Sequence, residues 1–171
     1  DIAAKKAGTV FLLKILSNID SLRQEQAIEL RRIGSVFNAS IFVIGEKSKA
    51  FDLSSGTVYE RYSVNCLNFE TFQRLIKNEL PEIKYFKGKK IVELDIQKFR
   101  EKRKLLGLTL ENIAQKINST SESIHRYETK GNTSLETALK LEKLLGEKLV
   151  RKIDIINQPL AEKIEQAANP D

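Results

Sequence analysis

The stretch that decides the fold is TLENIAQKINSTSESIHRYE, residues 109–128. Its apolar residues recur at helical spacing, which indicates two short helices with one buried face each. Thr109 and Thr120 are residues of the type that caps a helix start, and Asn118 tolerates the left-handed backbone of a tight turn. The residues expected to face inward are Ile113, Ala114, Ile117, Ile124 and Tyr127. This spacing predicts a helix-turn-helix.

Outward from this stretch, the chain shows two kinds of patterning. Residues 1–94 alternate short β-branched runs with amphipathic segments, which predicts an α/β domain with a small mixed sheet and flanking helices. One helical pattern then follows another, which predicts an all-α helix-turn-helix domain of four to five helices over 95–150. The remainder, 151–171, is expected to be a tail with a strand and a short helix.

The expected boundaries of the individual elements follow from turn residues and caps. They are strands over 10–16, 40–44 and 57–62, helices over 22–37 and 69–79, a β-hairpin over 83–94, a loop at 131–133, a tail strand over 149–156 and a tail helix over 159–168.

Composition limits the classes of protein that this chain can form. Its 171 residues are 41% hydrophobic and 30% charged, and no run of 18 residues is apolar, so we exclude a disordered chain and a membrane span. Lys and Arg outnumber Asp and Glu by 29 to 23, and this net charge of +6 is compatible with a nucleic-acid partner. Because the chain contains no methionine, we expect it to be the later part of a longer protein.

Cys66 is the only cysteine, which excludes an intramolecular disulfide and zinc sites built from several cysteines. We interpret it as a small buried hydrophobic residue in a cytoplasmic protein, with a reactive thiol as the alternative. We expect no catalytic residues, no metal site and no cofactor.

Four blocks carry a resemblance to a known family. They are FREKR at 99–103, LGLTLENIA at 106–114, IHRYE at 124–128 and SLETALKL at 134–141. Over residues 99–146 the chain resembles the lambda-repressor/Cro (XRE) class of helix-turn-helix DNA-binding domains. Through LKILSNID at 13–20 and similar blocks at 43–48, 58–62 and 68–72, the whole chain also resembles an archaeal group of helix-turn-helix transcriptional regulators. In that group a longer chain carries an α/β domain ahead of the DNA-binding domain.

The resemblance implies that the second helix of the motif enters the major groove of double-stranded DNA. Its outward residues would then face the bases, and these are Thr120, Ser121, Glu122, His125 and Arg126. Thr109 and the first amides of its helix would lie on phosphate, with Arg100, Arg103 and Lys130 as flanking phosphate ligands. Because Glu122 opposes Arg126, we expect modest affinity for each domain and binding as a homodimer to a palindromic operator.

The α/β half also loosely resembles the restriction-endonuclease-like fold, in which strand residues of the pattern acid-x-Lys hold Mg²⁺. Here Leu12 stands where the acid of Leu12-Leu13-Lys14 should be, and Glu46-Lys47-Ser48 lacks the lysine. We therefore expect a non-catalytic dimerisation or effector domain with an unidentified effector. Two alternatives stay open: an endonuclease-like protein with a degenerate or incomplete metal site, and a protein-interaction module with a vestigial helix-turn-helix.

The expected hairpin is rich in lysine, at Lys84, Lys87, Lys89 and Lys90. Lysines on a strand edge protect it against pairing with other chains, which is the first interpretation. An accessory contact with DNA is the second.

Overall fold

The computed structural model describes residues 1–157, so the tail helix expected over 159–168 lies outside the described residues. The chain divides into two compact units. The first joins residues 1–81 with residues from 153 onward, and the second comprises residues 82–152. The expected boundary at Leu94 falls inside the second unit, because the hairpin at 83–93 groups with the helices that follow it.

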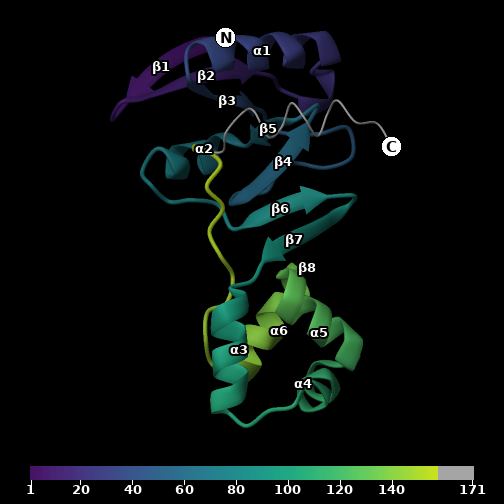
Figure 1. Cartoon of the computed structure of the whole chain (residues 1–171). Helices are drawn as coiled ribbons and strands as arrows, with labels where there is room; N and C mark the ends of the chain where they lie inside the picture. The colour runs from purple at the N-terminus through teal and green to yellow at the C-terminus, as the bar shows by residue number, and fades with distance from the viewer. Residues whose placement is uncertain (158–171) are drawn as a thin grey trace. The chain divides into compact units, whose positions relative to one another are not determined.

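The first unit is built on a mixed sheet (Figure 1). In spatial order its strands are β1 (Ile2–Lys6), β2 (Thr9–Ile15), β3 (Ala39–Ile44), β5 (Val64–Leu67) and β4 (Thr57–Arg61). The three central strands β2, β3 and β5 are parallel, whereas β1 and β4 pair antiparallel at the two ends of this order.

Two strands of this sheet were not predicted from the sequence. All residues of β1 are exposed, so the segment lacks the apolar alternation that marks a half-buried strand. Strand β5 has only four residues, and the polar Asn65 interrupts its apolar run. Strand β1 ends just before the two-residue turn Ala7-Gly8, and β5 begins just after the two-residue turn Tyr62-Ser63. Both residues of each turn have positive φ, which is the geometry that favours a hairpin.

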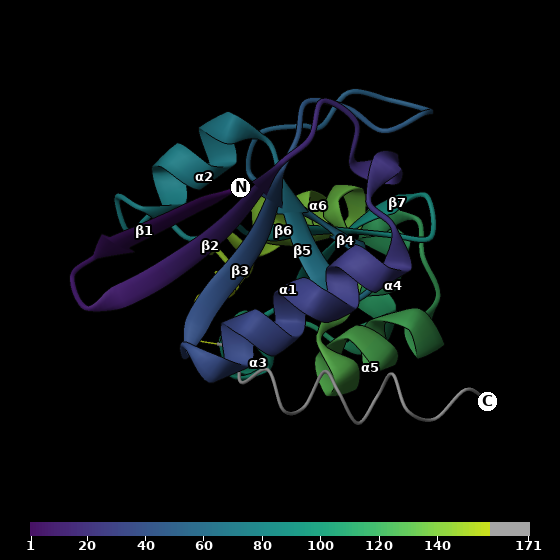
Figure 2. The same ribbon diagram turned by 90° about the horizontal axis from the view of Figure 1, so that it is seen from above.

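Helices α1 (Gln24–Val36) and α2 (Phe69–Leu75) cover opposite faces of this sheet, with the short 3-10 turn η1 (Ile19–Ser21) ahead of α1 (Figures 1 and 2). Helix α2 ends earlier than expected, because the backbone reaches positive φ at Asn78. The core on the α2 face is built around three aromatic rings, Phe11, Phe42 and Phe72.

The chain returns to complete this core after the second unit. Ile153 and Ile155 are 4% and 5% exposed and belong to the same apolar cluster. The Ile153 N–H donates to the Pro81 carbonyl at 2.8 Å, and Ser40 Oγ donates to the Ile156 carbonyl at 2.9 Å. The strand expected over 149–156 does not form. Its pairing with the hairpin segment is limited to one β-bridge between Leu94 and Val150 and one hydrogen bond from the Arg151 N–H to the Glu93 carbonyl.

The second unit contains an antiparallel sheet and four helices. Its strands are β6 (Ile83–Phe86), β7 (Lys89–Glu93) and β8 (Asn132–Ser134), and its helices are α3 (Ile96–Leu105), α4 (Leu110–Ile117), α5 (Ser121–Lys130) and α6 (Leu135–Leu145). The predicted hairpin is confirmed, but the expected loop at 131–133 contributes β8. The predicted fold class, a mixed sheet with helices followed by a helix-turn-helix region, is confirmed.

Four of the five predicted inward positions are buried in the core of the second unit, namely Ile113, Ala114, Ile117 and Ile124. Within residues 1–157, no helix combines the length and the apolar character that crossing a membrane requires.

Cys66 lies fully buried on β5, as interpreted from the sequence. Burial raises the pKa of its thiol to about 12, with the nearby Glu60 carboxylate adding to the rise. The thiol therefore stays protonated and unreactive at neutral pH.

Candidate nucleic-acid interface

Helix α4 starts at a reciprocal pair of hydrogen bonds. The Asn112 N–H donates to Thr109 Oγ1 at 3.1 Å, and the Thr109 N–H donates to Asn112 Oδ1 at 3.1 Å. These bonds satisfy donors that a helix start otherwise leaves without a partner. Thr109 is exposed, and the family resemblance predicts that it binds phosphate.

The turn between α4 and α5 has the predicted form. Asn118 adopts the left-handed conformation, with φ 55° and ψ 58°, and the Ser119 N–H donates to the Ala114 carbonyl at 2.8 Å. Ala114 is 3% exposed, so the small side chain lies where α4 and α5 approach each other closely. A larger residue here would push the two helices apart.

Helix α5 is oriented by its cap and by its buried face. Thr120 Oγ1 accepts a hydrogen bond from the Ser123 N–H at 3.2 Å. Ile124 is fully buried and Tyr127 is half-buried, so the predicted inward face of α5 is confirmed. The opposite face is therefore open to a ligand.

The residues predicted to read bases lie along this open face. Thr120, Glu122, His125 and Arg126 are exposed, and Ser121 is half-buried. The Arg126 guanidinium carbon lies 5.5 Å from the centre of the Tyr127 ring, a cation–π contact that leaves its N–H groups for other partners. Lys130 is exposed in the last turn of α5.

Glu122 is the one acid on the open face. The N–H of its own backbone, and then the Thr120 hydroxyl, hold the pKa of this carboxyl below its usual range. Glu122 therefore accepts hydrogen bonds but does not donate at neutral pH. This charge partly offsets that of Arg126.

The two flanking arginines of α3 have partners inside the second unit. Arg103 Nε lies 2.7 Å from Glu128 Oε1, and Arg103 Nη1 donates to the Leu108 carbonyl at 3.0 Å. Arg100 Nη2 donates to the Glu128 carbonyl at 2.8 Å. Both side chains thus hold the end of α5 against α3.

Sequence reasoning assigned no role to Glu128, which is 6% exposed. A signal was present, because Glu128 follows the inward-facing Ile124 by one helical turn and so lies on the buried face of α5. A carboxylate at such a position needs a cationic partner. Glu142 was missed in the same way: its Oε1 accepts from the N–H groups of Leu149 and Val150 at 2.8 and 2.9 Å.

The first unit contains one pair that bears on the endonuclease interpretation. Lys14 on β2 forms an ion pair with Asp1, with 3.2 Å between Nζ and Oδ1. Leu12 lies two residues before Lys14, hence on the same face of the strand. The structure thus brings an acid to Lys14 from beside β1, a residue that sequence reasoning had not considered.

Family models match part of each unit. Residues 1–81 match the PD-(D/E)XK superfamily domain, and residues 99–152 match the helix-turn-helix domain. The strand residues here do not supply the acid-x-Lys pattern that holds a divalent metal in that superfamily, because Leu12 stands where the acid should be. Among residues 1–157 there is no group of His, Cys, Asp and Glu side chains that could hold a metal ion.

The chain is also similar over most of its length to archaeal proteins named "Putative HTH-type transcriptional regulatory protein". Identity is 35% to one from Archaeoglobus fulgidus over 92% of this chain and 51% of the relative, and 34% to one from Methanocella arvoryzae over 91% and 48%. For one from Pyrococcus furiosus it is 32% over 100% and 55%.

The chain spans about half the length of these relatives, and no solved structure matches it significantly. The four ordered helices, the left-handed turn at Asn118 and the capped α5 are the geometry that the family match requires. The chain therefore carries a helix-turn-helix domain of the lambda-repressor/Cro (XRE) type and resembles the archaeal group of helix-turn-helix regulators along nearly all of its length.

Proposed function

We propose that the second unit binds double-stranded DNA with α5 in the major groove, and that the protein acts in the cytoplasm as a transcriptional regulator. The observation that carries this proposal is the open face of α5, which is held by a capped start and a buried opposite face. The names of the archaeal relatives support regulation as the purpose of binding.

Within this proposal each exposed residue has a distinct role. Arg126 donates to a guanine edge or a phosphate, and Glu122 accepts from a cytosine amine. Thr120, Ser121 and His125 complete the base-facing row, while Thr109 with the first amides of α4 lies on phosphate. Lys130 is a flanking phosphate ligand, and so is the exposed Arg100, which uses Nη2 for the Glu128 carbonyl and keeps its other N–H groups for phosphate. We assign Arg103 to positioning α5, because its guanidinium is held by Glu128 and Leu108.

We further propose that the protein binds a palindromic operator as a homodimer, with half-sites separated by about one turn of DNA, roughly 34 Å. One acid opposing one arginine on α5 gives modest electrostatic attraction for each domain, so two domains supply the affinity. The first unit would then serve dimerisation or effector binding without catalysis.

The decisive experiment is selection of bound duplexes from a randomised DNA library, using the full chain. Enrichment of one palindrome is expected, and no enrichment would overturn sequence-specific binding. On the recovered duplex, Arg126→Ala should weaken binding by about 1–3 kcal/mol if Arg126 contacts a base. The matched control is Lys98→Ala, which removes one exposed positive charge from α3 and should leave affinity nearly unchanged.

A second candidate function, DNA cleavage, is favoured only by the superfamily match over residues 1–81. Incubation of the chain with plasmid and Mg²⁺ separates the two functions. We expect no cleavage, because Leu12 leaves the site one acid short. Cleavage that a chelator abolishes would contradict the proposal.

A further inference from the structure

We propose that the hairpin formed by β6 and β7 is a second DNA-contacting element, in which Lys87 and Lys89 bind phosphates beside the site reached by α5. This inference rests on the proposed DNA binding of the second unit. It concerns residues that neither the helix-turn-helix match nor the base-facing row includes.

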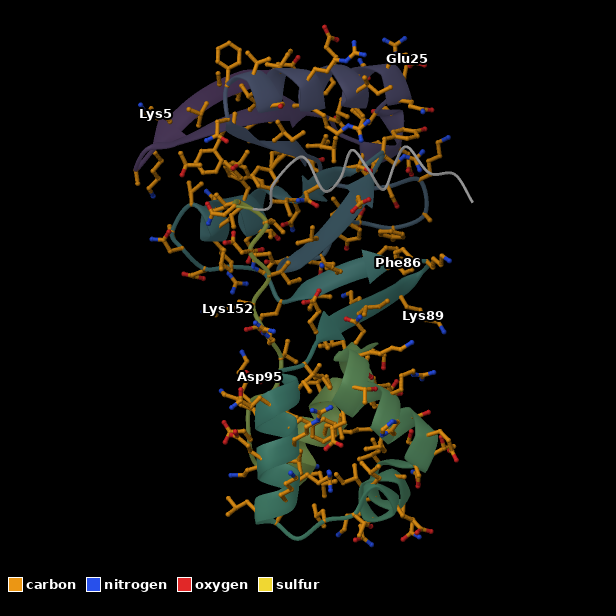
Figure 3. The ribbon with its side chains drawn as sticks, in the orientation of Figure 1. Lys5, Glu25, Phe86, Lys89, Asp95 and Lys152 are labelled. Atoms are coloured by element: carbon orange, nitrogen blue, oxygen red, sulfur yellow. The ribbon has the colours of Figure 1, made fainter. Side chains whose placement is uncertain are left out.

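The hairpin presents its basic residues at a narrow, well-defined tip. Lys87 and Gly88 form a two-residue turn with φ of 47° and 80°, and Phe86 pairs with Lys89 across it. Figure 3 shows Phe86 and Lys89 together at this end of the hairpin. Phe86 is 56% exposed, and the Lys87 ammonium lies 5.3 Å from the centre of its ring. The ring thus contacts one side of the Lys87 ammonium by a cation–π interaction and leaves its other sides exposed to water.

The charge at this tip is not neutralised by neighbouring acids. Glu93 is paired with Lys84 at 2.9 Å, and Glu82 is paired with Lys148 at 2.7 Å, so both acids of the hairpin segment have partners. Within the part of the chain that the structure describes, neither Lys87 nor Lys89 forms an ion pair. An approaching phosphate therefore meets two lysines without having to break a salt bridge first.

The hairpin is tied firmly to α5. Strand β8 pairs with β7, matching Ser134 with Ile91, and it begins directly after Gly131, which ends α5. The Leu94 N–H donates to the Gly131 carbonyl at 2.6 Å, so the end of β7 is bonded to the residue that ends the helix. In Figure 1 the hairpin turn and α5 both lie toward the right of the second unit.

These observations favour the phosphate backbone of duplex DNA over a base-specific contact. Lysine presents a compact point charge on a flexible stem, which suits phosphate and carries no sequence information. Contacts of this kind raise affinity equally for all sequences and make binding more dependent on salt.

The test is a salt titration of duplex binding with the full chain. It uses one duplex recovered by selection and one of unrelated sequence. Lys87→Ala/Lys89→Ala is compared with Lys98→Ala/Lys143→Ala, which removes the same charge from exposed positions on α3 and α6. The hairpin variant should lower the slope of log K against log salt by about 0.9 for each lysine on both duplexes. The control variant should keep the wild-type slope.

Each failure is separately identifiable. If the wild-type chain binds no duplex even at low salt, the proposed function itself fails. If it binds, and Arg126→Ala weakens binding, but the hairpin variant behaves like its control, only this inference is overturned. If the hairpin variant keeps its slope and self-associates, the lysines protect a strand edge instead, which overturns the inference as well. Thermal melting of both double variants shows whether each one remains folded.

Discussion

Glu128 and Arg103 form a largely buried ion pair in the second unit. The side chains are 8% and 18% exposed, so little water is available to replace either partner. Glu128→Ala would leave Arg103 without its carboxylate, and we expect a loss of about 3 kcal/mol in the free energy of unfolding. Urea denaturation of the full chain measures this loss.

Two further variants separate charge from packing at this pair. Glu122→Ala removes an exposed glutamate from the same helix and should cost much less stability than Glu128→Ala. Replacing both partners, as Arg103→Met/Glu128→Leu, should recover much of the stability lost in Glu128→Ala. A double variant as unstable as the single one would show that the ion pair itself is not the cause.

Cys66 gives the first unit a dependence on alkaline pH. Its thiol ionises near pH 9.0 in the unfolded chain and near 12 in the folded one. A raised folded pKa means that its stabilising contribution is complete below pH 9 and is lost as the pH rises toward 12. Between pH 8 and pH 10 the wild type should lose about 1.4 kcal/mol of unfolding free energy more than Cys66→Ala does. Urea denaturation at the two pH values measures the difference.

At the scale of elements, Gly131 joins α5 to β8 under two constraints at once. It has φ of 74°, and a Cβ there would lie 3.2 Å from the Leu94 carbonyl oxygen and 3.3 Å from Ile96. Gly146, which ends α6, has φ of 63° but open space around it. Gly131→Ala should therefore cost more than Gly146→Ala, for which about 1–2 kcal/mol is expected from backbone strain alone.

Thermal unfolding measures the loss of stability in each of these two glycine variants. Equal losses would mean that the Leu94 carbonyl next to Gly131 moves aside without strain when a Cβ is added. A larger cost at Gly131 should be accompanied by weaker DNA binding, because the same residue ties the hairpin to α5.

Most elements were predictable because their signals are local. The caps at Thr109 and Thr120, the left-handed Asn118 and the inward stripe of α4 are all properties of a few neighbouring residues, and the structure contains each of them. The strands β1 and β8 were missed because their signal is not local. β1 is wholly exposed and β8 has three residues, so each exists only through its pairing partner.

The candidate site divides along the same line. The open face of α5 follows from helical periodicity, so its residues were predictable. The engagement of Arg103 was not, because Glu128 lies far along the chain and ion pairing between helices leaves no periodic pattern. Asp1 was missed for the same reason, since its approach to Lys14 depends on the pairing of β1 with β2.

At the scale of the whole molecule, the first unit is made from two separate segments of the chain. A chain ending at Lys152 would lack Ile153 and Ile155, which are buried in the core of the first unit. We expect the first unit to lose about 3 kcal/mol or more, from the apolar surface left exposed to water. A chain ending at Asn157 keeps both residues and is the matched control.

Hydrogen exchange of backbone amides, resolved by residue, measures this difference. Amides of β2 and β3 should exchange faster in the chain ending at Lys152, while those of α5 should keep their protection. Should that chain fail to accumulate, Ile153→Ala/Ile155→Ala in the chain ending at Asn157 makes the same test. Unchanged exchange in β3 would show that the returning segment adds nothing to the first unit.

The returning segment also sets an order of events during synthesis. Residues 1–81 emerge from the ribosome first, yet the core of that unit stays incomplete until Ile153 and Ile155 have been synthesised. The whole helix-turn-helix unit emerges in between, with its own complete core. We therefore expect the later-encoded unit to reach its native state on the nascent chain before the earlier one does, the reverse of the usual vectorial order.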